Sequence, residues 1–129
     1  MKKTSPPKPT DTELAILRVL WDRGASTVRD VHDALAHIKK TTGYTTVLKL
    51  MQIMTDKGLV TRDEAKRSHV YSARKAAEDT QRQLVADLMD RAFGGAAQAL
   101  VMRALSVKKT SKLELQEIRK LVDKLEKQS

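Results

Sequence analysis

The chain contains no cysteine, which excludes disulfide bonds, thiolate metal sites and cysteine nucleophiles. It is also poor in aromatic residues, because its 129 residues include one Trp, two Tyr and one Phe. Apolar residues nevertheless make up 40% of the chain, which is enough for a packed core. Such a core must be built mainly from Leu, Val, Ile, Met and Ala.

Long apolar runs are absent as well. No stretch approaches the roughly 20 apolar residues of a membrane-spanning helix, and the polar start of the chain lacks the apolar segment of a signal peptide. Pro6, Pro7 and Pro9 oppose regular structure there, so residues 1–9 are expected to form a flexible arm. These features predict a cytoplasmic protein with no membrane contact.

The chain carries an excess of positive charge. It has 25 Lys and Arg against 16 Asp and Glu, a formal net charge of +9. Residues 1–74 hold 14 of the basic and 8 of the acidic side chains, so most of the excess lies in this part. A balance of this kind favours an anionic partner, and nucleic acid before all others.

Two capping signals predict the first two helices. Thr10 precedes Glu13 by three residues and Thr27 precedes Asp30 in the same way, the spacing of a capping box. Gly24 is expected to end the first helix in a left-handed cap, and the second helix is expected to run to about Ile38. The apolar faces at helical spacing are Leu14, Leu17, Leu20 and Trp21 in the first helix and Val31, Ala34, Leu35 and Ile38 in the second.

A third helix is expected from Tyr44 to Lys57, after a short turn at residues 41–43 and before Gly58. Its inward face is predicted to be Val47, Leu50, Met51 and Met54. After this helix the apolar residues no longer recur at helical spacing. Residues 59–62 and 69–72 look like two short strands, and the polar residues 63–68 look like the loop between them.

Three helices followed by a hairpin predict a winged helix-turn-helix domain. In that motif the second helix of the pair enters the major groove and the first lies across the DNA backbone. The third helix is therefore expected to read DNA, and Lys66 and Arg67 in the wing loop to contact phosphate. The predicted DNA-binding residues are Thr27, Arg29, Tyr44, Thr45, Thr46, Lys49, Gln52, Lys66 and Arg67.

The rest of the chain is expected to be helical. An apolar stripe runs to residues 93–95, residues 96–105 form a second segment, and Ser111 can cap a last helix. Helices this short and this sparsely apolar need a partner, and an identical chain is the simplest one. The predicted dimerisation residues are Leu84, Leu88, Phe93, Leu100, Ile118, Leu121, Val122 and Leu125.

The expected organisation is therefore mostly α with a small β-hairpin: a flexible arm at 1–9, a winged-helix DNA-binding domain at 10–74 and a helical dimerisation domain at 75–129. The chain has no glycine-rich phosphate loop and no nucleophile elbow, and His32 and His37 are not spaced to share a metal. No enzymatic activity, catalytic residue, metal or cofactor is expected. A winged-helix adaptor that binds proteins is an alternative, although the basic excess and the polar outward face of the third helix favour DNA.

Several short segments occur in an order that one known family shows. They are residues 12–17, Trp21, residues 27–31, 44–47, 57–60, 69–72 and 93–95. Together they resemble the penicillinase repressors of the BlaI/MecI type, a family that also includes copper-responsive regulators of the CopY type. The resemblance implies a winged helix, a helical dimerisation domain and repression from a palindromic operator, often of resistance or stress-response genes.

The chain departs from this family's pattern in two places. In the best-known members a sensor protease relieves repression by cutting an Asn-Phe pair, and the corresponding residues here are Arg103 and Ala104. Release by such a protease is therefore in doubt. The copper-responsive branch uses a C-terminal cysteine cluster, and without cysteine copper sensing by that route is excluded.

Overall fold

The computed structural model describes residues 8–38, 42–65 and 67–129. Most of the predicted arm, Thr41 of the predicted turn and Lys66 of the predicted wing lie outside the described residues. The chain divides into two compact units, one ending at Leu84 and the other beginning at Val85. The elements of the first unit are α1 (Asp11–Arg23), α2 (Val28–Ile38), α3 (Tyr44–Lys57), β1 (Val60–Asp63), β2 (Val70–Ala73) and the first turns of α4 (Ala77–Phe93).

The first two helices begin where their capping signals stand. Thr10 accepts the Glu13 N–H at 3.2 Å while the Glu13 carboxylate accepts the Thr10 N–H at 2.9 Å. Thr27 and Asp30 exchange the same two bonds, both at 3.1 Å. Each pair satisfies two N–H groups that the first turn of a helix otherwise leaves free.

The ends of these two helices differ from the prediction. Gly24 donates to the Leu20 carbonyl at 2.8 Å, but its φ of 86° is combined with a ψ of −163°, so it is not the left-handed cap that we expected. Ile38 is 68% exposed, whereas we predicted that it faces the core. The last three residues of α2 are all exposed because the helix runs past the edge of the core that Val31 and Leu35 reach.

The third helix has the predicted bounds and ends in a Schellman cap. Gly58 adopts a left-handed conformation and donates to the Thr55 carbonyl, and Leu59 donates to the Met54 carbonyl at 2.9 Å. On the inward face Val47, Met51 and Met54 are fully buried, and Leu50 is half-buried.

The wing is a two-stranded antiparallel hairpin whose strands start and end one residue later than predicted. Val60 pairs with Ala73 and Asp63 with Val70. Leu59 does not join the strand because its N–H already serves the cap of α3, and His69 lies just outside the last paired residues. A bridge between Ser26 and Tyr71 ties the hairpin to the segment before α2.

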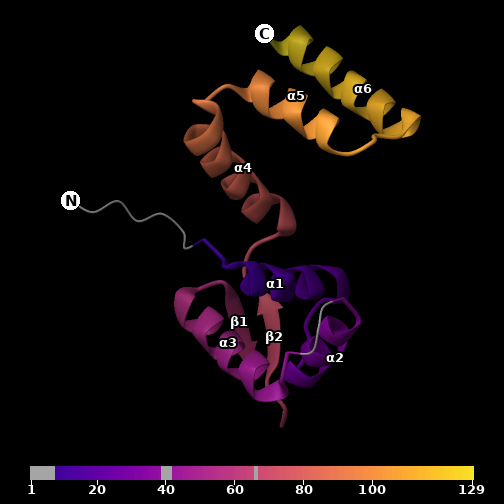
Figure 1. Cartoon of the computed structure of the whole chain (residues 1–129). Coiled ribbons are helices and arrows are strands. Elements are labelled where there is room, and N and C mark those ends of the chain that lie inside the picture. Colours follow the sequence, from indigo (N-terminus) through magenta and orange to yellow (C-terminus); the bar gives the residue numbers. More distant parts are fainter. Residues whose placement is uncertain (1–7, 39–41, 66) are drawn as a thin grey trace, which may run out of the picture. The chain divides into compact units, whose positions relative to one another are not determined.

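A single hydrophobic cluster holds these elements together, with α1, α2 and α3 placed around the hairpin (Figure 1). Tyr71 brings the hairpin into this cluster and is 1% exposed. The indole N–H of Trp21 donates to the Lys75 carbonyl at 2.9 Å, which fixes the chain between the wing and α4 to the end of α1. The expected mostly helical winged-helix architecture is confirmed.

The second unit contains the rest of α4, α5 (Ala97–Val107) and α6 (Lys112–Gln128). Helix α5 starts one residue later and ends two residues later than predicted. The predicted cap of α6 is present, because Ser111 accepts the Glu114 N–H at 3.1 Å. None of residues 85–129, all of which are described, is buried. Among the described helices, none has the length and apolar character needed to cross a membrane.

Candidate nucleic-acid interface

The outward face of α3 is polar and exposed. Thr45, Thr46, Lys49 and Gln52 all stand in solvent, as their spacing predicts. The buried side chains on the opposite face fix the orientation of this helix against the core. Two hydroxyls, an ammonium and an amide are therefore presented together, and these groups suit base edges and phosphates.

A groove of about 230 Å³ lies beside this face. Its lining comes from the start of α2, the start of α3 and the hairpin, so residues far apart in sequence meet there. The described lining residues include no acidic side chain. They are Thr27, Val28, Arg29, Tyr44, Leu48, Arg67, Ser68, His69 and Tyr71.

Four of the predicted DNA-binding residues line this one groove: Thr27, Arg29, Tyr44 and Arg67. Thr27 is half-buried and its hydroxyl already accepts the Asp30 N–H, so its main contact is the cap of α2. The hydrogen bonds from Thr27 also lower the pKa of the Asp30 carboxyl. Arg29 and Arg67 are exposed cations from different elements.

Tyr44 contacts two side chains of α2. The guanidinium carbon of Arg29 lies 5.1 Å from the centre of the Tyr44 ring, in cation–π geometry. The His32 ring meets the same ring at a centroid distance of 6.0 Å and an interplanar angle of 62°. The sequence alone indicates only an ordinary surface histidine at His32. Its spacing from Arg29 places both residues on one face of α2, but the sequence does not show which side chain packs against that face.

The wing carries a further cation that we did not single out. Arg62 is paired with Tyr71 across the hairpin and donates a hydrogen bond to Glu64 at 2.8 Å. These two interactions, Tyr71 first, raise the pKa of Arg62 above its usual value. Since Glu64 balances the charge of Arg62, the predicted wing residue Arg67 is the better candidate for contact with an anion.

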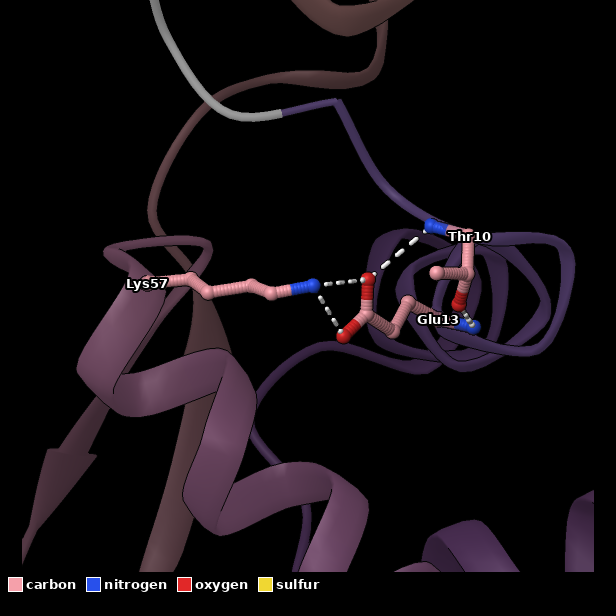
Figure 2. A network of polar contacts seen from close by, with 3 residues as sticks. All are labelled: Thr10, Glu13 and Lys57. Carbon is pink, nitrogen blue, oxygen red and sulfur yellow. Dashed lines mark hydrogen bonds and ion pairs between the residues drawn. The ribbon is translucent and has the colours of Figure 1, made fainter.

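The end of α3 is held by an ion pair between Lys57, which is partly exposed, and the buried carboxylate of Glu13. Lys57 reaches both carboxylate oxygens of Glu13, at 3.0 and 2.9 Å, and Glu13 is 2% exposed (Figure 2). Burial opposes ionisation of Glu13, but the Thr10 N–H and the Lys57 ammonium outweigh it and hold the pKa of this carboxyl below its usual 4.5. We predicted only the capping role of Glu13.

None of the predicted dimerisation residues, all of which the structure describes, is buried. Leu84 is half-buried and lines a groove of about 340 Å³ between α1 and the start of α4, which also contains Trp21. The other seven lie in the second unit: Phe93, Leu100 and Ile118 are half-buried, and Leu88, Leu121, Val122 and Leu125 are exposed. Arg103 and Ala104 are exposed on α5.

Two solved structures are similar in fold to part of this chain. One is a solution structure of monomeric BlaI from Bacillus licheniformis in complex with the blaP half-operator; it is 20% identical, with a TM-score of 0.50 over 58% of this chain and 90% of that one. The other is a solution structure of the DNA-binding domain of the repressor BlaI, 21% identical, with a TM-score of 0.51 over 60% and 93%. No curated protein matches the chain by sequence.

The family model for the penicillinase repressor matches residues 9–124. This match spans both units, whereas the two solved structures cover 58% and 60% of the chain. Because it covers most of the sequence, the chain belongs to the penicillinase repressor family, whose members are transcriptional repressors and not enzymes.

Proposed function

We propose that this chain acts as a homodimer on a palindromic operator and represses resistance or stress-response genes. In this proposal α3 lies in the major groove, where Thr45, Thr46, Lys49 and Gln52 read base edges. Tyr44, Arg29 and Arg67 bind the phosphates beside it.

The observation that carries the proposal is the groove beside α3. It gathers Arg29, Tyr44 and Arg67 from three elements, next to a helix whose outward face is polar. A cationic groove adjoining an exposed polar helix suits the two tasks of a DNA reader, because phosphate contacts position the protein and base contacts give specificity.

The DNA complex of BlaI supports one winged helix per half-site. That protein binds the blaP half-operator in its monomeric form. If this chain binds in the same way, two copies are needed to occupy both halves of a palindrome, and the symmetry of the operator follows that of the dimer.

The second unit supports self-association. Its residues include no buried side chain, and Leu121, Val122 and Leu125 of α6 are 55%, 49% and 53% exposed. Helices of this length are marginal in water without packing. Burial against a second copy would remove these apolar surfaces from water.

Selection of DNA by the full chain tests the proposal. We expect the chain to enrich one palindromic sequence from random duplexes, and its affinity for that duplex to fall steeply between low and moderate salt as counterions are released. A chain that enriches no sequence over bulk DNA contradicts the proposal and favours a protein-binding adaptor.

A further inference from the structure

Tyr44 begins α3, and its side chain is contacted from α2. The residue before it, Gly43, caps the helix without a side-chain hydrogen bond, and Tyr44 is 41% exposed. Among the described residues, Arg29 and His32 both contact its ring, and they lie three residues apart on one face of α2. The orientation of the Tyr44 ring therefore depends on α2.

His32 is placed to support this ring without touching the groove. It is not among the residues that line the groove, whereas Tyr44 and Arg29 are. Its Nδ1 lies 3.0 Å from a carboxylate oxygen of Asp33, which fixes the imidazole from the side of α2. Asp33, His32, Tyr44 and Arg29 thus form a chain of contacts that ends at the groove.

We propose that His32 is a positioning residue for DNA binding that acts through Tyr44. By holding the Tyr44 ring, it keeps the ring face under the Arg29 guanidinium and so keeps that cation at the groove. A guanidinium that is already oriented loses less side-chain freedom when it binds a phosphate. The inference rests on the proposed function, because it assigns Arg29 and Tyr44 to the bound DNA backbone.

Two replacements of His32 separate its ring from its hydrogen bond. His32→Asn retains a polar atom for Asp33 but removes the ring, and His32→Phe retains the ring but removes the polar atom. Aromatic contacts of this kind contribute a factor of about two to ten in an equilibrium constant. We expect His32→Asn to weaken binding by about that factor and His32→Phe to bind nearly as well as the unchanged chain.

The measurement is fluorescence anisotropy with a labelled duplex that the unchanged full chain selects from random DNA. The same substitutions are made in a Tyr44→Ala background, where His32→Asn should cause no further loss because its effect passes through Tyr44. A general loss of folding would weaken binding in both backgrounds. Thermal unfolding of each variant shows whether a loss of binding comes from a folding defect. The milder Asp33→Ala variant removes the carboxylate beside His32 and leaves the ring contact with Tyr44 in place.

Three results would overturn the inference. One is equal affinity of His32→Asn and the unchanged chain, and another is an equal loss in the presence and absence of Tyr44. In both cases the selected duplex is still bound, so the proposed function stands. The third is that the unchanged chain selects no duplex, which removes the proposed function and the inference together.

Discussion

The carboxylate of Glu13 and the ammonium of Lys57 join the first turn of α1 to the last turn of α3, across 44 residues of sequence. Glu13 also caps α1 through Thr10, so one carboxylate stabilises a helix start and positions the end of another helix. The far end of the proposed DNA-reading helix is thereby fixed to the core.

Replacing Glu13 with Gln should lower the free energy of unfolding by about 1–3 kcal/mol, the cost of a broken buried polar interaction. The loss should stay below the roughly 3–5 kcal/mol of a fully buried pair, because Lys57 is 35% exposed and its ammonium can reach water. Urea unfolding measures the change. Asp11→Asn, an exposed carboxylate in the same turn, is the control, and equal stability of the two variants would contradict the prediction.

The same pair predicts a pH dependence. Since the pKa of Glu13 is lower in the folded chain than its usual 4.5, its charge stabilises the fold above that value, and this contribution is lost as the pH falls through the folded pKa. The difference in unfolding free energy between the unchanged chain and Glu13→Gln should therefore be constant near neutral pH and shrink below about pH 4.5. A difference that grows on acidification would show that the sign is wrong.

Substitutions on the outward face of α3 should alter sequence preference. We expect the Lys49→Ala variant, and separately a double variant with Thr45→Ala and Thr46→Ala, to bind the selected duplex more weakly. The loss should be about 1–3 kcal/mol for each good hydrogen-bonded contact between a side chain and a base edge that the substitution removes. Binding to a scrambled duplex should change less. Lys127→Ala, which removes an exposed cation from α6, serves as the control. If both α3 variants keep the affinity of the unchanged chain, this face does not read the bases.

Arg67→Ala should behave differently from the α3 variants. Removing a cation that binds phosphate weakens binding to selected and scrambled duplexes alike, and it lowers the slope of log affinity against log salt by about 1. Titrations of both duplexes at several salt concentrations measure this. A weakening confined to the selected duplex would instead assign Arg67 to base recognition.

Charges placed on the apolar face of α6 should prevent self-association. We expect the unchanged chain to sediment as a dimer, and a Leu121→Glu and Leu125→Glu double variant to sediment as a monomer, because carboxylates would have to be buried in the interface. The variant should still bind a half-site duplex but lose affinity for the palindrome. Lys127→Glu adds a carboxylate away from the apolar face and should remain dimeric. A dimeric double variant would exclude this face from the interface.

Features that depend on neighbouring residues were predictable from the sequence. The capping pairs at Thr10 and Thr27 and the cap at Ser111 are local, and their hydrogen bonds form within three residues. The helical period likewise placed Val47 and Met51 inside and Thr45 and Lys49 outside. One error has a local cause, because the cap of α3 takes Leu59 from the strand, and the other depends on packing, because α2 carries Ile38 beyond the core.

The sequence by itself thus determined the order and type of the elements and the polar face of α3, since helix caps and periodicity act over a few residues. Only the tertiary structure decided which side chains meet across elements: Glu13 with Lys57, Tyr44 with Arg29 and His32, and Arg67 at the same groove. These contacts depend on how the helices and the hairpin pack against a shared core, and no local pattern in the chain specifies that packing.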